Sequence, residues 1–554
     1  MAEGLPLTHQ ALPAAQSGGV PDPILAGLAR GWKVKGGPHG ALPAQLHCDV
    51  VIIGTGAGGG ITAELLTKAG LSVVMVEEGP LKSSSDFKQL ESEAYPALYQ
   101  ESAGRKTADK AITILQGRCV GGSTTVNWTS SFRTPTDTLQ HWGQHFGLSD
   151  FSPEAMAPWF EQAEQRLNIG DWLTPPNENN ELLRRGAQKL GIEASAIRRN
   201  VKGCWNLGSC GMGCPTNAKQ SMLVTTVPAA LDAGATLLVQ TRAERLQVMG
   251  QKVESVLCHP IKPDGTPDAN SPCRIVAKHV VVAAGAINSP ALLMRSALPD
   301  PHQRLGKRTF LHPVVMSAGV FSQKVEGWQG APQTIYSDHF LHTQAIDGPM
   351  GYKLEAPPIH PLIFTSTLAG FGLAQAETLR RFPNIHTLLA LLRDGFHEQS
   401  PGGQVRLRSD GSPELHYPLN DFVMDGARRA LLSMAEIQFA AGAQEIQVIH
   451  EQAPVMRSWA EAQTVIKALP MVPLKTRVVS AHVMGGCGLS GTEAGGVTRP
   501  DGVHWQVENL SIHDGSLFPT SVGANPQLSI YGLTTRLATA LAQRLGGRPV
   551  RLAA

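Results

Sequence analysis

The sequence predicts an α/β protein (α+β overall) in which a Rossmann-like domain is joined to a second domain built on an antiparallel sheet backed by helices. Three observations lead to this prediction. The chain has 554 residues, which exceeds the size at which one hydrophobic core keeps growing, so two or more lobes are expected. Apolar runs at 50–53 and 73–76 flank a glycine-rich turn and a stretch compatible with a helix. Between about 320 and 470 the pattern changes to a strand hairpin followed by a long amphipathic helix.

The glycine-rich turn carries the fingerprint of a dinucleotide-binding strand–turn–helix unit. Gly54 permits the tight turn, Gly56 lets the backbone approach a pyrophosphate, and Gly59 lets the helix pack on the strand. The N-terminus of the helix then offers free N–H groups and a favourable dipole to the phosphates. Glu77 ends the second apolar run, where a ribose hydroxyl needs an acceptor. The unit indicates a site for an ADP-containing dinucleotide and does not by itself distinguish FAD from NAD.

The remaining pattern divides the chain into four stretches. Residues 1–46, rich in Pro, Gly and Ala, are expected to form an N-terminal arm over the surface. We assign 47–320 to the dinucleotide-binding domain, with an inserted cap and cysteine loop at about 150–230 and a hairpin around Gly250 leading back to its sheet. Residues 321–470 form the second, substrate-binding domain, with a hairpin at 404–417 and a helix from about 421 to 441 that ends at a left-handed Gly442. Residues 471–554 return to the first domain.

The composition limits the classes of partner. A net charge of +2 with 17% charged residues gives no reason to expect nucleic acid or an anionic membrane. No apolar run approaches the length that would span a bilayer, and the N-terminus lacks the pattern of a signal peptide. A cytoplasmic location is therefore expected, with peripheral association with the inner membrane left open. Eight cysteines are too few for a disulfide scaffold.

Four separated blocks resemble one enzyme family. They read GRCVGGSTTVNWTSSFRTP (117–135), GAINSPALLMRS (285–296) with GKRTFLHP (306–313), AHVMGGC (481–487) and HDGSLFPTSVGANPQLSI (513–530). In this order they resemble the glucose–methanol–choline (GMC) oxidoreductases, FAD enzymes that oxidise alcohols. The likeness runs from about residue 47 to the C-terminus. The motifs are most similar to the branch of long-chain fatty alcohol oxidases and cholesterol oxidases.

The resemblance implies a non-covalently bound FAD and suggests which residues hold it. The Gly121–Gly122–Ser123 loop would lie against the isoalloxazine and ribityl portions, with Asn127 near the flavin, and the backbone near Ala243 would meet the adenine. In the family, the segment around Asp514 closes over the flavin. The cofactor-binding residues implied in this way, beyond Gly54, Gly56, Gly59 and Glu77, are Arg118, Gly121, Gly122, Ser123, Asn127, Ala243, Asp514, Gly515 and Pro526.

The resemblance also implies a catalytic pair. Oxidation of an alcohol requires a hydride acceptor, a group that takes the hydroxyl proton and a hydrogen-bonding partner for the oxygen. His482 is the candidate base, because imidazole titrates near working pH, and Asn525 is the candidate partner, because its amide both donates and accepts. The HVMGG form departs from the usual HxxGT pattern and is shared with the cholesterol oxidases. His312 is expected to serve the fold instead of the chemistry.

A short loop contains three cysteines, Cys204, Cys210 and Cys214. Their spacing is similar to the loop that binds a [3Fe–4S] cluster in FAD glucose dehydrogenases of bacteria, so a cluster is one hypothesis. A disulfide or other redox role and a purely structural role remain open, because part of the loop also resembles the fatty alcohol oxidases. The other five are read as structural: Cys48, Cys119, Cys258, Cys273 and Cys487.

The sequence therefore predicts FAD-dependent oxidation of a hydrophobic (long-chain or bulky) alcohol to the aldehyde or ketone. The apolar preference has mild support from residues 357–374, although most of that stretch is expected to be a buried strand and helix. One alternative is a sugar or polyol dehydrogenase that passes electrons through an Fe–S cluster to a cytochrome or quinone. Another is a non-oxidative flavin enzyme such as a fatty acid decarboxylase. The electron acceptor, whether oxygen, a quinone or a cytochrome, is not settled.

Overall fold

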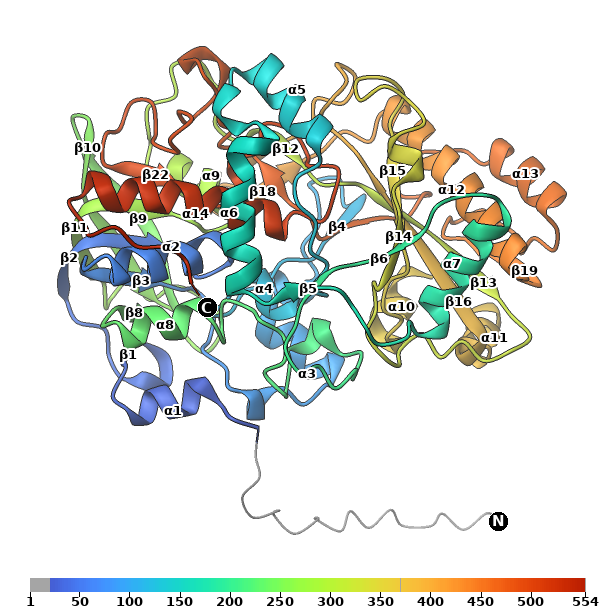
Figure 1. Cartoon of the computed structure of the whole chain (residues 1–554), viewed down its shortest axis with the longest axis horizontal. Coiled ribbons are helices and arrows are strands. Elements are labelled where there is room, and N and C mark those ends of the chain that lie inside the picture. Colours follow the sequence, from blue (N-terminus) through green and yellow to red (C-terminus); the bar gives the residue numbers. More distant parts are fainter. Residues whose placement is uncertain (1–19, 369, 554) are drawn as a thin grey trace, which may run out of the picture.

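The computed structural model describes residues 20–368 and 370–553, and the first sheet within them has eight strands (Figure 1). The strand order is β1–β8–β3–β2–β11–β10–β9, with β22 beside β11. Strands β1, β8, β3, β2, β11 and β22 are parallel, and β10 and β9 continue the sheet in antiparallel fashion. The strands are β1 Lys33–Lys35, β2 Gln45–Ile53, β3 Val73–Val76, β8 Thr236–Leu238, β9 Thr241–Met249, β10 Lys252–Pro260, β11 Cys273–Val282 and β22 Leu510–Ile512.

Helix α2 (Ala57–Lys68) connects β2 to β3 and is buried along most of its length. It packs between α8 (Thr226–Asp232) and α14 (Gln527–Arg544), and Figure 1 shows α14, from the end of the chain, beside α2, from its beginning. Because neighbours cover it on several sides, α2 carries small and apolar residues without a pronounced polar stripe. The predicted strand–turn–helix–strand unit and the hairpin around Gly250 are both confirmed.

The second sheet has the order β4–β20–β13–β16–β15–β14–β6, with β19 also beside β13. Its pairs are antiparallel except for β20 with β4. Helix α12 (Asp421–Ala441) backs one face and itself packs against α7 (Glu178–Lys189) and α13 (Trp459–Ala468). The strands are β4 Ile112–Ile114, β6 Ser195–Ala196, β13 Val314–Val320, β14 Ile335–Ser337, β15 Tyr352–Glu355, β16 Ile385–Leu392, β19 Glu445–Val448 and β20 Val478–Ser480. The predicted antiparallel sheet backed by helices is confirmed, and β4, β6, β13 and β20 join it from outside 321–470.

The two faces of this sheet have different neighbours. Along β16, Leu388, Ala390 and Leu392 belong to the core shared with α12, whereas the alternate residues Leu389 and Leu391 belong to a separate apolar cluster. This alternation follows from the two-residue period of a strand. The second cluster lines the cavity described below.

The predicted hairpin at 404–417 is also confirmed, but it belongs to a third sheet. Strands β17 (Gly403–Leu407) and β18 (Pro413–His416) pair there with β12 (Lys307–Phe310) and β21 (Met484–Gly485). The remaining elements are α1 Pro23–Ala29, α3 Glu91–Leu98, α4 Ser123–Val126, α5 Thr136–Phe146, α6 Pro153–Arg166, β5 Ile169–Gly170, β7 Arg199–Asn200, α9 Asn288–Arg295, α10 Pro361–Thr367 and α11 Leu373–Arg380.

The structure of two segments differs from the sequence prediction or adds detail to it. The stretch 357–374 is not a buried strand and helix: α10 and the start of α11 lie there, and Leu362, Phe371 and Leu373 are exposed. The N-terminal arm adds β1 to the edge of the first sheet, while its residues 1–19 lie outside the described residues. In the described part of the chain, no helix has the length and apolar character needed to cross a bilayer.

The end of α12 gives a test of the fold. Gly442 caps the helix with φ of 106°, and a Cβ at this position would meet no atom within 4 Å. We expect Gly442→Ala to destabilise the protein by about 1 kcal/mol, because only the strain of a left-handed backbone is added. The midpoint of denaturant-induced unfolding measures this change. Gly442→Asn should cost less, and an alanine variant at least as stable as the wild type would contradict the assignment.

Candidate functional site

A cavity of about 750 Å³ lies between the first and second sheets. Its walls include the turn after β2, the loop before α4, residues from β13 and β16, and the segment that precedes α14. Of the residues implied by the sequence, the cavity is lined by Gly54, Gly56, Glu77, Gly122, Ser123, Asn127, Ala243, His482, Asp514, Gly515, Asn525 and Pro526. The fold thus brings together most of the predicted site residues from both ends of the chain.

The geometry of the first turn fits the roles that the motif predicts for its three glycines. Gly54 has φ of 99°, and a Cβ at Gly59 would collide with the carbonyl oxygen of Gly54. Gly59 does not line the cavity, which fits its packing role. At Gly56, by contrast, the nearest atom to an added Cβ would be Gly122 Cα at 3.8 Å. The space in front of Gly56 is therefore left for a ligand and not filled by protein.

Glu77 lies at the end of β3 with its carboxylate buried. Oε2 accepts from Thr55 N (3.1 Å) and Thr55 Oγ1 (2.6 Å), and Oε1 accepts from Gly79 N (2.9 Å). Burial raises the pKa of Glu77, although these hydrogen bonds oppose the shift. Since a carboxylate has about four acceptor positions, one is left for a ribose hydroxyl.

The second loop packs directly on the first turn. Gly121 N donates to Thr55 Oγ1 (3.1 Å), and a Cβ at Gly122 would meet Gly56 Cα at 2.8 Å. Asn127 Nδ2 donates to Gln527 Oε1 at the start of α14 (2.7 Å). Arg118 and Gly121 do not line the cavity, and Arg118 instead pairs with Glu78 (3.2 Å). Direct contact of these two residues with a cofactor stays a prediction.

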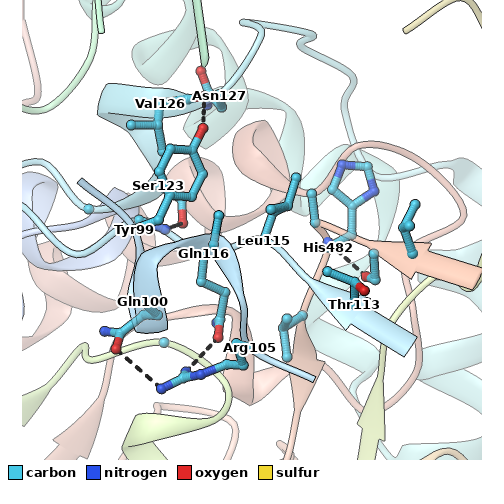
Figure 2. Close-up of a pocket in the computed structure, with 18 of the residues that line it drawn as sticks. Tyr99, Gln100, Arg105, Thr113, Leu115, Gln116, Ser123, Val126, Asn127 and His482 are labelled. Carbon is cyan, nitrogen blue, oxygen red and sulfur yellow. Dashed lines mark hydrogen bonds between the residues drawn. The ribbon is translucent and has the colours of Figure 1, made fainter. Parts of the chain in front are cut away.

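Arg105 is a cavity residue that sequence reasoning missed (Figure 2). The side chain is buried, and its guanidinium donates to Glu101 (2.9 Å), Gln116 (2.8 Å) and Gln100 (3.2 Å). Residues 101–103 have φ values of 50°, 54° and 64°, a conformation that is costly for residues other than glycine. Arg105 therefore holds a strained turn against the cavity, and no sequence motif marks it.

His482 lies at the cavity with its ring in contact with His312. Gly523 N donates to His312 Nε2 (3.0 Å), so the proton of neutral His312 is on Nδ1. That atom lies 3.3 Å from His482 Nδ1 and donates to it. Neutral His482 consequently carries its own proton on Nε2. Burial lowers the pKa of His482 to about 4, so the ring is uncharged at neutral pH.

His312 was expected to serve the fold, and it is buried and does not line the cavity. Its contact with His482 nevertheless determines the tautomer of the candidate catalytic ring.

Asn525 is nearly buried and contacts a carboxylate that the sequence did not reveal. Its Nδ2 donates to Glu355 Oε2 (3.3 Å), while Oδ1 has no hydrogen-bond partner among the described residues. Glu355 ends β15 and also accepts from Gln333 Nε2 (2.6 Å). The amide oxygen of Asn525 is thus buried without a partner among the described residues, and such an atom requires an explanation.

Comparison with known proteins shows to which family the chain belongs. Two models described as GMC oxidoreductase match residues 95–314 and 399–534. An uncharacterized GMC-type oxidoreductase of Mycobacterium tuberculosis is 31% identical over 500 residues, which covers 90% of this chain and 76% of the relative. The chain belongs to the GMC oxidoreductase family.

Two further proteins extend this comparison. A long-chain-alcohol oxidase of Arabidopsis thaliana is 28% identical over 526 residues, covering 90% of this chain and 68% of the relative. A formate oxidase of Aspergillus oryzae has the same fold, with a TM-score of 0.66 at 14% identity, covering 91% of this chain and 100% of that chain. FAD is the expected cofactor of a GMC oxidoreductase, and the open space at Gly56 together with the remaining acceptor position of Glu77 fits its ADP portion.

The cysteine loop does not support the predicted cluster. Among the described residues, no three His, Cys, Asp or Glu side chains are placed to hold a metal ion. The sulfurs instead have separate partners: Cys204 accepts from Asn206 N, Cys210 from Arg199, and Cys214 from Lys219 N. All eight cysteines are free thiols. The spacing of the loop resembles a cluster site, but each sulfur has its own hydrogen-bond partner.

The contrast between Gly56 and Gly59 tests the cofactor site. We expect Gly56→Ala to weaken FAD binding by on the order of 10-fold or more with little change in the stability of the apoprotein, because its Cβ would enter the ligand space. Gly59→Ala should instead lower the stability of the apoprotein by about 1–3 kcal/mol, because its Cβ would collide with protein.

Flavin titration and thermal unfolding of the apoprotein measure the two effects separately. Equal loss of stability in both variants, with equal FAD affinity, would contradict the assignment.

Proposed function

We propose that this GMC oxidoreductase oxidises a hydrophobic alcohol, long-chain or bulky, to the aldehyde or ketone with FAD as cofactor. The observation that carries the proposal is the meeting of His482 and Asn525 with the glycine turns in one cavity that has an apolar wall. Bound FAD would supply the hydride acceptor, while the protein binds and orients the alcohol. The long-chain-alcohol oxidases among the relatives support the same substrate class.

An apolar part of the cavity wall favours a hydrocarbon over a sugar. Val314, Met316, Leu389, Leu391 and Ile449 form one apolar cluster that lines the cavity. A sugar in this part of the cavity would leave several hydroxyls without partners, which costs about 1–3 kcal/mol for each buried group. An alkyl chain has no hydroxyl groups to leave without partners. The electron route through an Fe–S cluster, which supported the sugar dehydrogenase alternative, also lacks a site in the cysteine loop.

His482 and Asn525 together can bind a single hydroxyl group. His482 can donate its Nε2 proton to the hydroxyl oxygen, and Asn525 Oδ1 can accept the hydroxyl hydrogen. This polarity differs from the predicted role of His482 as the base, because Nε2 already carries a proton and the lowered pKa makes the ring a weak proton acceptor. We therefore propose that neutral His482 binds the substrate oxygen as a hydrogen-bond donor. The hydroxyl proton, which the amide of Asn525 cannot take up, is then released to water as the hydride leaves the carbon.

An anaerobic panel of alcohols tests the substrate class. Long-chain primary alcohols and bulky secondary alcohols should bleach the flavin absorbance of the purified holoenzyme, whereas glucose and short polyols should not, because only the former match the apolar wall. Readmission of air then shows whether oxygen reoxidises the flavin. Reduction by glucose without reduction by any long-chain alcohol would contradict the proposal.

Two substitutions at one position separate the roles of His482. His482→Ala should retain FAD and lower the rate of flavin reduction by about 10²–10⁴-fold. His482→Gln keeps an N–H donor but cannot act as a base, so it should recover part of the lost rate. Stopped-flow measurement of flavin reduction compares the variants. An alanine variant with the full rate would rule out a role for His482, and a glutamine variant no faster than alanine would favour the base.

A further inference from the structure

Two buried charged residues, Glu355 and Lys353, lie next to Asn525 or one step beyond it, and Asn525 Nδ2 donates to Glu355. Glu355 and Lys353 are two residues apart on β15, so both side chains point to the same face of the strand. Both side chains are almost fully buried. Glu355 Oε1 has no hydrogen-bond partner among the described residues, although its other oxygen has two. Such a group requires an explanation, because an unpaired buried carboxylate oxygen is costly.

Aromatic rings hold the ammonium in place. Lys353 Nζ lies 3.7 Å from the centroid of Phe132 and 3.9 Å from that of Tyr336, and its nearest carboxylate in an ion pair is Asp338 at 3.9 Å. Contacts with two ring faces stabilise a buried cation. The positive charge of Lys353 in turn favours the ionised form of Glu355.

Few other titratable groups face this carboxylate. Tyr336 lies opposite Glu355 on β14, where burial raises its pKa and keeps it neutral. On β16 the neighbour is Leu389. Toward the cavity, burial lowers the pKa of His312 well below its ordinary value, so that ring is also neutral. Lys353 is therefore the main charge acting on Glu355, with Asp338 beyond it.

We propose that the charge on Glu355 determines which end of the Asn525 amide faces the substrate, and that Glu355 is thus a positioning residue for hydroxyl recognition. An ionised carboxylate can only accept, so it holds the Nδ2 end of Asn525 and leaves Oδ1 for the hydroxyl hydrogen. A protonated Glu355 can donate, which permits the flipped amide and presents Nδ2 instead. In the flipped state His482 and Asn525 would both offer donors, and the hydroxyl hydrogen would lose its acceptor.

The inference predicts an acidic limb in the pH profile of hydroxyl binding. Burial raises the pKa of Glu355 above the ordinary range of a carboxyl. The competent, ionised form is present above this pKa and is lost as the pH falls through it. Affinity for an alcohol should therefore decline on acidification at a higher pH than an ordinary glutamate would give.

The probe is a long-chain tertiary alcohol, whose carbinol carbon carries no hydrogen and cannot give up a hydride. Its binding to the oxidised holoenzyme, followed by perturbation of the flavin spectrum, reports hydroxyl recognition without turnover. For Glu355→Gln we expect affinity to fall by on the order of 10-fold and the acidic limb to disappear, because glutamine does not titrate and fits either amide orientation.

Lys353→Met provides a second variant that does not touch Asn525. Loss of the ammonium should raise the pKa of Glu355 and move the acidic limb to higher pH, whereas Lys353→Arg should restore its position. Flavin content and thermal unfolding verify that each variant is folded. If the acidic limb of the pH profile stays in place in both Glu355→Gln and Lys353→Met, the inference is overturned. If Glu355→Gln does not fold, the two lysine variants decide alone.

The inference rests on the proposed oxidation of a hydrophobic alcohol, and the two can fail separately. If the wild type is reduced by no alcohol, the proposed function fails. If the wild type is reduced by long-chain alcohols while Glu355→Gln binds the tertiary alcohol with unchanged affinity and pH profile, only the inference fails.

Discussion

The structure depends on close backbone approach around the N-terminus of α2. A Cβ at Gly58 would collide with the carbonyl oxygen of His513, and a Cβ at Gly54 with that of Ala283. Gly122 approaches Gly56 from the second loop in the same way. Segments hundreds of residues apart thus meet without side chains between them. Because the chain continues from His513 into the segment that carries Asn525, the packing of this turn also locates the far side of the site. The glycines therefore fix the turn after β2 and the position of the segment that carries Asn525 together.

Buried polar groups around this centre are paired in ways that orient their neighbours. Asp514 accepts from Gly285 N (2.9 Å) and Ser516 N (2.8 Å), which joins two cavity loops. Arg105 holds a turn with three left-handed residues in a row, and such a conformation persists only when its surroundings over-determine it. Each of these groups would be costly to bury alone. These buried charged groups thus hold the loops at the cavity in place. A substitution that removes one hydrogen-bonding partner is therefore expected to alter the position of a loop as well as the stability of the protein.

The elements that could be predicted from the sequence are those specified by local pattern. The β2–α2 unit, the hairpin around Gly250 and helix α12 with its Gly442 cap depend on residues close in sequence, and all three are confirmed. Glu355, Arg105 and the role of His312 could not be predicted, because their contacts depend on strand register and on turns that bring distant segments together. The cysteine loop shows how little spacing alone establishes: the spacing suggested a shared centre, whereas each of the three sulfurs has its own hydrogen-bond partner. The exposed residues of α10 and α11 show that an apolar composition does not by itself indicate burial.

The arrangement around a hydroxyl group follows from the number of donors and acceptors available. A hydroxyl has one hydrogen to donate and lone pairs to accept with, so a dry site recognises it only when a donor and an acceptor are both fixed. Each of the two candidate catalytic residues could by itself present either polarity: an imidazole has two tautomers and an amide has two orientations. In this chain, Gly523 N acts through His312 to select the tautomer of His482, and Glu355 selects the orientation of Asn525. The tautomer of His482 and the amide orientation of Asn525 thus depend on residues that do not line the cavity. Identification of this candidate pair alone would not show which atom of each residue donates and which accepts.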